Sequence, residues 1–193
     1  MAARYGVEVR IERIERPGPD GYSLGKTVVL ADDLYAPRRN FIFCHELAHI
    51  LLNHTEKTTK RHQDEHDADR MAVELMLPET EFRQNMARLS FLELRSLYTH
   101  ASWEVVARRW SQLRPAVLTI YDNGLLKVRT APEGLNYPPR PTEPEIILFN
   151  QTMEAKEHLN LTDPPLSISS YFIDEGKGVE RVILLTEVEE YSA

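Results

Sequence analysis

His45, Glu46 and His49 follow the spacing His-Glu-x-x-His, and these three residue types can hold and use a metal ion. On a helix, residues four apart stand one above the other on the same face, so both imidazoles can reach a single ion. Glu46, one position along, then lies beside the open coordination side, where a carboxylate can take a proton from water. The pattern therefore predicts metal-assisted hydrolysis, with Zn²⁺ as the ion and Glu46 as the catalytic base.

The sequence around this motif is apolar on almost every side. The apolar neighbours are Phe41, Ile42, Phe43, Leu47, Ala48, Ile50, Leu51 and Leu52. Burying two histidines and a glutamate among them without partners costs several kcal/mol, and a bound metal removes that cost. This cost disfavours the alternative of two core histidines bonded only to backbone carbonyls. Cys44 points about 100° away from His45, so we interpret it as a buried, inert thiol.

Two histidines need a third protein ligand. An all-histidine site would have glycine three residues and histidine six residues after His49, but Leu52 and Thr55 occupy those places. His54 would point to another face of the same helix. A carboxylate from the next predicted helix is the better candidate, as in sites built from two histidines and a glutamate.

The acidic residues at the start of that next helix are Asp64, Glu65, Asp67 and Asp69. Counting about 100° per residue, Asp64 falls within the apolar stripe of the helix, while Glu65 and Asp67 lie near its two margins. Helical geometry therefore narrows the choice of third ligand without making it.

The elements that must position these residues can be predicted from periodicity. Residues 7–14 and 26–30 read as strands that form a small sheet in front of the metal helix. That helix is expected from Arg39 or Asn40 to Asn53, followed by a polar stretch over 54–63. A second helix over 64–77 is stopped by Pro78.

Further helices are expected from Thr80, Ser90 and Ser102. The last two have the outline of a helix-turn-helix over 90–114. Six arginines and two glutamates lie between Arg83 and Arg114, a local surplus of four positive charges. Tyr98, His100 and the arginines of the last two helices are candidate oxyanion donors. The apolar stripe of the last helix is expected to be core, which disfavours a DNA-reading face. It consists of Trp103, Val106, Ala107 and Trp110.

After these helices, residues 118–129 carry the Asn-Gly signal of a hairpin turn. Prolines are dense over 131–144, which we interpret as a linker. A short helix near 152–159 and strands near 168–173 and 179–185 then predict a small α/β extension. The expected domains are therefore 1–130, including the helix-turn-helix-like segment 90–114, then the linker 131–144 and the extension 145–193.

Composition limits the functional class. The 193 residues are 42% hydrophobic and 27% charged, as in globular proteins, and no stretch approaches the roughly 20 apolar residues that cross a bilayer. The amino terminus lacks the apolar segment of a signal peptide, and the single cysteine agrees with a reducing compartment, so a cytoplasmic location is expected. The net charge of −7 argues against general nucleic-acid binding.

Two blocks, 40–53 and 65–78, resemble the ImmA/IrrE family of zinc metallopeptidases. The second block contains Asp67-Ala68-Asp69 and ends in Leu75-Met76-Leu77-Pro78. The resemblance implies that Asp67 stands where the family places its third ligand, a glutamate. Because Asp67 has the shorter side chain, Glu65 remains the alternative ligand.

The resemblance implies an α+β fold with a zincin-like core, in which a small sheet supports the HExxH helix and a ligand helix. It also implies a cytoplasmic zinc endopeptidase that cleaves a helix-turn-helix repressor, in the control of mobile elements or of stress and DNA-damage genes. The alternative is a zinc-containing regulatory module that binds DNA or protein without peptidase activity. Glu46 favours catalysis, since a structural zinc site has no use for a carboxylate beside its first ligand.

Overall fold

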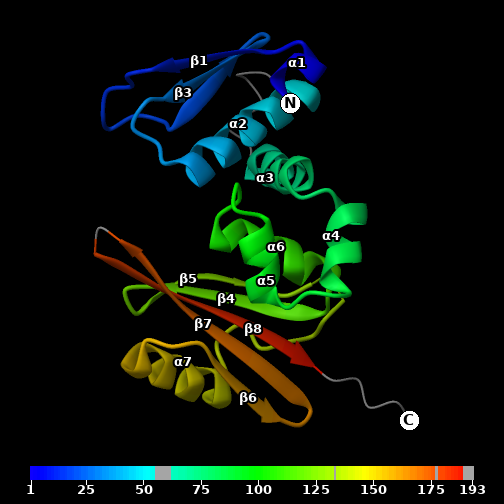
Figure 1. The fold of residues 1–193 in the computed structure, drawn as a ribbon, viewed down its shortest axis with the longest axis vertical. Helices are drawn as coiled ribbons and strands as arrows, with labels where there is room; N and C mark the ends of the chain where they lie inside the picture. Colours follow the sequence, from blue (N-terminus) through cyan, green and yellow to red (C-terminus); the bar gives the residue numbers. More distant parts are fainter. Residues whose placement is uncertain (55–61, 133, 177, 189–193) are drawn as a thin grey trace. The chain divides into compact units, whose positions relative to one another are not determined.

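The computed structural model describes residues 1–54, 62–132, 134–176 and 178–188, and the polar stretch predicted over 54–63 falls mostly outside them. The chain divides into two compact units, Met1–Val106 and Ala107–Ala193. Within the described ranges there are seven helices and two sheets (Figure 1), so the predicted α+β class is confirmed. None of these helices is long and apolar enough to cross a membrane.

The first unit opens with a short helix, α1 (Ala2–Tyr5), and a three-stranded sheet of order β1-β3-β2. β1 (Glu8–Glu12) runs parallel to β3 (Thr27–Ala31), and β2 (Gly21–Leu24) runs antiparallel to β3 at the other edge. The sequence predicts β1 and β3. It misses β2, because a four-residue strand that begins with glycine and is followed by Gly25 is too short to show an alternating pattern.

Helix α2 (Ala36–Leu51) packs on this sheet. It begins before the predicted start because Pro37 lies in its first turn, where a proline costs nothing. The buried residues between sheet and helix are Val7, Val28, Leu30, Ala31, Leu34, Ile42 and Leu47. A Cβ atom on Gly21 would lie 2.6 Å from Cγ2 of Ile42 and 2.9 Å from the carbonyl oxygen of Val29. Glycine therefore allows β2 to approach α2 closely.

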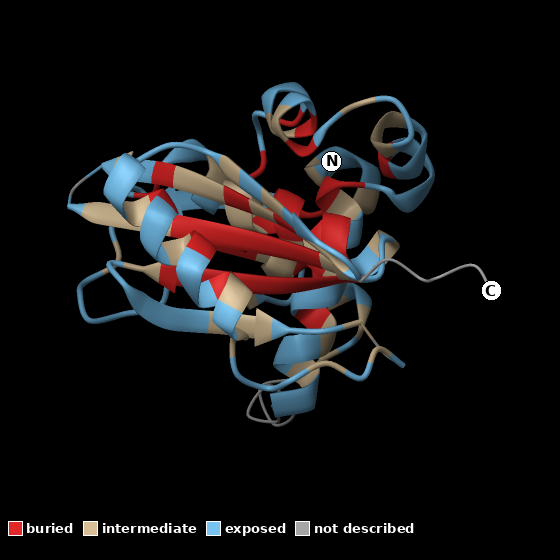
Figure 2. Ribbon diagram, turned by 90° about the horizontal axis from the view of Figure 1, so that it is seen from below, coloured by how far each residue is buried: buried red, intermediate tan, exposed pale blue. Residues whose placement is uncertain are grey.

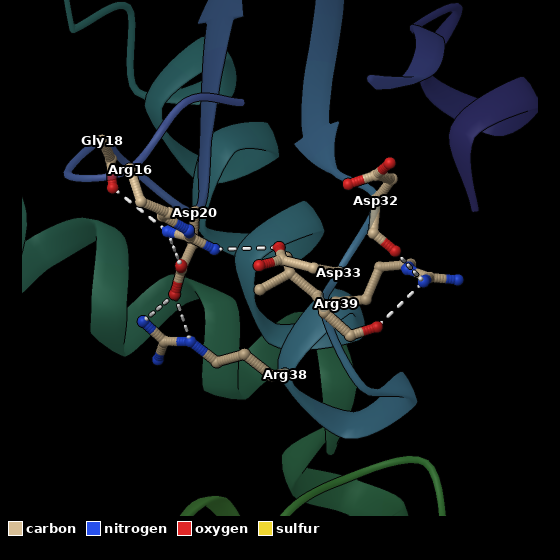
Figure 3. Close-up of polar contacts among 8 residues, drawn as sticks. Arg16, Gly18, Asp20, Asp32, Asp33, Arg38 and Arg39 are labelled. Atoms are coloured by element: carbon tan, nitrogen blue, oxygen red, sulfur yellow. Dashed lines mark hydrogen bonds and ion pairs between the residues drawn. The ribbon is translucent and has the colours of Figure 1, made fainter. Parts of the chain in front are cut away.

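A network of charges ties the loop before β2 to the start of α2 (Figure 3). Arg16 donates to Asp20 and to Asp33 at 2.9 Å in each case, and Arg38 donates to the other oxygen of Asp20 at 2.7 Å. These groups are partly exposed, so we attribute to them a role in orienting the loop rather than a large stabilisation.

Helix α3 (His62–Met76) packs along α2, and α4 (Glu79–Met86) follows after Pro78. The predicted helix over 64–77 is thus confirmed to within two residues at each end. Its apolar stripe is largely buried, with Ala68 and Ala72 fully so.

The two helices of the predicted helix-turn-helix outline are present as α5 (Phe91–Leu97) and α6 (Trp103–Leu113). Ser90 begins α5 with a capping box, in which its hydroxyl accepts from the N–H of Glu93 and the Glu93 carboxylate accepts from the N–H of Ser90. In α6 the apolar stripe is buried, as predicted for core residues, at Val106, Ala107 and Trp110. That the pair contacts DNA or an acidic partner remains a prediction.

The second unit is a five-stranded antiparallel sheet of order β5-β4-β8-β7-β6 with helix α7 packed against β6, β7 and β8. Its elements are β4 (Ala116–Asp122), β5 (Leu125–Thr130), α7 (Glu143–Ala155), β6 (Leu159–Asp163), β7 (Leu166–Gly176) and β8 (Val179–Val188). Residues along the central strands β4 and β8 are buried (red in Figure 2), whereas the edge strand β5 is largely exposed.

The hairpin of β4 and β5 turns at Asn123 and Gly124 with φ values of 48° and 79°, as the Asn-Gly signal predicts. From the sequence, this hairpin is expected in the first domain, before a linker over 131–144. In the structure β4 pairs with β8 from Ala116↔Glu187 to Asp122↔Arg181, so one sheet includes strands from both sides of that segment. The physical reason is that an isolated two-stranded hairpin is marginal in water and needs further strands.

The helix predicted near 152–159 is α7, which begins at Glu143 and ends at Ala155. Thr142 and Glu145 form a capping box that begins α7, and Lys156 in the left-handed conformation (φ 55°) ends it. Residues 159–163 then form β6. This capping box in the proline-rich segment was the available sequence signal.

Candidate metal centre

Helix α2 places His45 and His49 one above the other, with their Nε2 atoms 3.0 Å apart and their ring centroids 4.6 Å apart. Both side chains are withdrawn from solvent, with 14% of His45 and 6% of His49 exposed. The predicted pairing of the two imidazoles on one helical face is therefore present in the structure.

Helix α3 brings Glu65 to these two nitrogens. One carboxylate oxygen lies 3.3 Å from Nε2 of His45, and the other lies 3.7 Å from Nε2 of His49. Ligands held at about 2.0–2.2 Å around a tetrahedral zinc ion lie roughly 3.3–3.5 Å from one another. Among the described residues, His45, His49 and Glu65 form a group whose spacing is compatible with one metal ion.

The structure does not bring Asp67 to this group. Its carboxylate accepts from Nε2 of Gln63 at 3.1 Å and lies 3.7 Å from the guanidinium of Arg70. Asp67 follows Glu65 by two residues, which rotates it about 200° around the helix axis. Glu65, the alternative third ligand, therefore lies beside the two histidines. Asp67, the preferred third ligand, does not.

Asp69 lies one turn after Glu65 on the same face of α3 and reaches the other ring nitrogen of His45, at 2.9 Å from Nδ1. Burial lowers the pKa of His45, but the hydrogen bond and the charge of Asp69 outweigh it, so the net shift is upward. In the neutral ring this contact places the proton on Nδ1 and leaves a lone pair on Nε2.

A lone pair on His45, the nearby Nε2 of His49 and the Glu65 carboxylate thus meet at one place. Such a donor set is stable only with a cation, which can be a shared proton or a metal ion. Burial lowers the pKa of His49, which favours the neutral imidazole that binds metals. The two histidines and one carboxylate fit zinc by ligand type and by spacing.

Glu46 lies beside the edge strand β2. The hydroxyl and the backbone N–H of Ser23 are near its carboxylate and favour its charged form. Burial raises the pKa of Glu46, and these groups of Ser23 counter this only in part. Sequence reasoning identified Glu46 but missed Ser23, because the strand that carries it has no periodic signal.

Two candidate oxyanion donors have structural partners instead. The Tyr98 hydroxyl accepts from Asn85 at 2.8 Å and donates to Glu81 at 3.4 Å. Nε2 of His100 donates to the carbonyl of Met76 at 3.1 Å. These contacts connect α3, α4 and the end of α5, and nothing in the described residues brings either side chain to the histidine pair.

Cys44 is buried, as expected, and its Sγ lies 3.9 Å from Sδ of Met1. Burial raises the pKa of its thiol to about 12, so it stays protonated and unreactive at neutral pH.

The arginines between Arg83 and Arg114 do not form one free positive face. Arg109 is only 4% exposed. Arg95 lies over the ring of Trp103, Arg114 lies over Trp110 and pairs with Glu187, and Arg83 pairs with Glu79. Much of the local positive surplus is therefore engaged within the chain.

Comparison with known proteins agrees with this site. Residues 2–111 match the family model Peptidase_M78, described as the IrrE N-terminal-like domain. This segment contains both the histidine pair of α2 and the carboxylates of α3. No match was found among curated proteins.

Proposed function

Because the chain belongs to the IrrE N-terminal-like (Peptidase_M78) family, we propose that it is a zinc-dependent endopeptidase with His45, His49 and Glu65 as metal ligands. The observation that carries this proposal is the convergence of two imidazole nitrogens and one carboxylate, with Glu46 fixed beside them. A structural zinc site would close with a fourth protein ligand and would not need Glu46.

The metal, when bound, polarises the peptide carbonyl and lowers the pKa of water. Glu46 takes a proton from the attacking water and passes it to the nitrogen of the leaving amine, so the carboxylate is regenerated in each cycle. Its raised pKa suits this exchange, since a carboxylate of ordinary pKa holds a proton less readily near neutrality. The hydroxyl and the backbone N–H of Ser23 are the polar neighbours that favour the charged form of Glu46.

The outer edge of β2 is the surface on which we propose that the substrate backbone binds. β2 pairs on one side with β3, and on the other side the backbone N–H of Ser23 is directed to Glu46. An extended peptide that adds to this edge through main-chain hydrogen bonds would carry a scissile bond past Glu46. Main-chain hydrogen bonds of this kind do not depend on the substrate sequence, so specificity comes from contacts with the substrate side chains.

We further propose that the substrate is a cytoplasmic protein, a helix-turn-helix repressor. Support comes from the family resemblance in the blocks 40–53 and 65–78. The net charge of −7 and the internal partners of Arg95, Arg109 and Arg114 favour a protein partner over DNA.

Glu46→Gln is the variant that tests the proposed chemistry. The amide is nearly isosteric but cannot accept the proton, so we expect zinc content to be unchanged and cleavage to fall by about 10²–10⁴-fold. The zinc-loaded protein is incubated with a proteome-derived peptide library, and new amino termini are counted by mass spectrometry. Glu12→Gln, at an exposed position on β1, is the matched control and should cleave as the wild type does.

Full cleavage by Glu46→Gln would assign the base to another residue. If the wild-type protein holds zinc but cleaves neither a library peptide nor a helix-turn-helix repressor, the result would favour the alternative of a zinc-containing regulatory module.

A further inference from the structure

The second ring nitrogen of His49 also has a partner. Nδ1 of His49 lies 2.9 Å from Nδ1 of His54, with the two rings 5.1 Å apart at 63°. This contact is on the opposite side of the His49 ring from Nε2, which faces His45 and Glu65. His54 is therefore placed to act on His49 and not to join the metal ligands.

The end of α2 explains how His54 reaches this position. Asn53 adopts the left-handed conformation at φ 56°, which reverses the chain after the last helical turn. The N–H of Asn53 donates to the carbonyl of Ile50, and the N–H of His54 donates to the carbonyl of His49. This is the double hydrogen bond of a Schellman C-cap, in which asparagine is tolerated at the left-handed residue. From the sequence, the helix is expected to extend to Asn53, so that His54 would point to another face of it.

The far nitrogen of His54 faces Asp64 on α3. Nε2 of His54 lies 3.8 Å from Oδ1 of Asp64, which is ion-pair range but longer than a direct hydrogen bond. The other carboxylate oxygen, Oδ2, is buried and has no hydrogen-bond partner among the described residues. Only 12% of the His54 side chain and 18% of the Asp64 side chain are exposed. A buried carboxylate that is short of donors favours a proton on the nitrogen that faces it, which here is Nε2 of His54.

We propose that Asp64 and His54 are positioning residues that fix the tautomer and the ring orientation of His49. Asp64 favours the tautomer of His54 that carries its proton on Nε2, which leaves Nδ1 of His54 as an acceptor. His49 must then carry its proton on Nδ1 and present a lone pair on Nε2. Carboxylate and backbone partners of metal-binding histidines act in this way, and here a second histidine extends the chain by one link.

The two ligand histidines thus have different partners at their Nδ1 atoms. Asp69 contacts Nδ1 of His45 directly, whereas Asp64 acts on His49 through His54. Both arrangements place the imidazole proton on Nδ1, away from Glu65, so that the lone pairs on the two Nε2 atoms point to the same place. The role in metal binding rests on the proposed function, but the tautomers can be measured without metal.

The first test reads the tautomers in the full-length, metal-free protein by long-range ¹H–¹⁵N spectroscopy of assigned histidines at neutral pH, where a proton held on Nε2 of His45 takes the place of the metal ion. We expect the Nδ1–H form of His49 and the Nε2–H form of His54. Asp64→Ala should populate the other tautomer of both rings. An Nε2–H form of His49 in the wild type, or unchanged tautomers in Asp64→Ala, would overturn the proposal.

The second test measures zinc affinity by competition with a chelator, together with the visible spectrum of the cobalt-substituted protein. His54→Ala removes the acceptor and should weaken zinc binding by about 10–100-fold with an altered cobalt spectrum. His54→Asn keeps an acceptor near the position of Nδ1 and should recover most of the affinity. His66→Ala, an exposed histidine of α3, is the matched control and should bind zinc as the wild type does.

The two proposals fail in different ways. The predicted tautomers in a protein that binds no zinc would refute the peptidase and leave the His54 contact standing. Normal cleavage, with the same zinc affinity and cobalt spectrum in His54→Ala as in the wild type, would refute only the role of His54. If His54→Ala does not fold, the His54→Asn variant and the wild-type tautomers still decide.

Discussion

At the scale of single residues, the second unit depends on a fully buried carboxylate, Glu145. Both its oxygens accept from the guanidinium of Arg129, at 3.0 and 3.1 Å. Its remaining lone pairs accept from Thr142 and from the hydroxyl of Thr186 on β8. Glu145 therefore joins β5, α7 and β8. A buried ion pair of this kind is strongly destabilising when one partner is removed, because the other charge is left unpaired.

This network predicts a pH dependence of stability. Burial raises the pKa of Glu145, but the bonds from Arg129 and the threonines outweigh it, so its pKa lies below the ordinary value of 4.5. A carboxyl group whose pKa is lowered by folding stabilises the folded state at pH values above its ordinary pKa. This stabilisation is lost as the pH falls through the pKa of the folded state. We expect the free energy of unfolding of the wild type to fall in this acid range, and that of Glu145→Gln to fall less steeply.

Urea unfolding at a series of pH values measures this difference. Glu157→Gln, an exposed glutamate after α7, is the control and should follow the wild type. Near neutrality Glu145→Ala should cost about 3–5 kcal/mol, because Arg129 stays buried without its partner. Equal slopes for Glu145→Gln and the wild type in acid would contradict the assignment.

The metal-site residues show what helical phase can and cannot predict. His45, Glu46 and His49 follow from the spacing alone, because the motif fixes which face they share. The choice between Glu65 and Asp67 depends on how α3 is rotated against α2, and the apolar stripe left both at its margins. The pair Glu65 and Asp69, four residues apart, was the useful signal, since it matches the spacing of the two histidines that it faces.

At the scale of elements, the contact between β2 and α2 positions the proposed base. Gly21 begins β2 at a point where a side chain would meet Ile42 and the backbone of β3. Ser23, two residues along, lies near the Glu46 carboxylate and favours its charged form. The close approach of strand and helix thus sets the position of the carboxylate.

Gly21→Ala should therefore destabilise the first unit by about 1–3 kcal/mol, since the added methyl group must displace the helix or the strand. Urea unfolding measures the loss. Gly25→Asn is the control, because Gly25 has open space around it and a φ of 58° that asparagine tolerates. A Gly21→Ala protein as stable as the control would show that β2 and α2 can separate at no cost.

Elements with a strong periodic signal were predictable, and those set by tertiary pairing were not. The stripes of α3 and α6 and the turn at Asn123 gave correct positions. β2 and β6 were missed, because they have only four and five residues and become strands by pairing with β3 and β7. The left-handed Asn53 at the end of α2 was likewise not predicted, and it determines where His54 lies.

At the scale of the whole molecule, the two units differ in what they carry. The family match over 2–111 covers nearly the same residues as the first unit, Met1–Val106, which contains the histidine pair and the α3 carboxylates. Within the described residues, the second unit supplies none of the grouped metal-binding side chains. The proposed chemistry thus belongs to the first unit.

The central claim is that His45, His49 and Glu65 hold one metal ion, and zinc content measures it most directly. The full-length protein and its Glu65→Ala and Asp67→Ala variants are loaded with zinc, dialysed and analysed by mass spectrometry of the metal. We expect about one zinc per chain in the wild type and in Asp67→Ala, and substoichiometric zinc in Glu65→Ala, which loses a charged ligand. Zinc lost from Asp67→Ala but retained by Glu65→Ala, or a wild-type protein that retains none, would contradict the account.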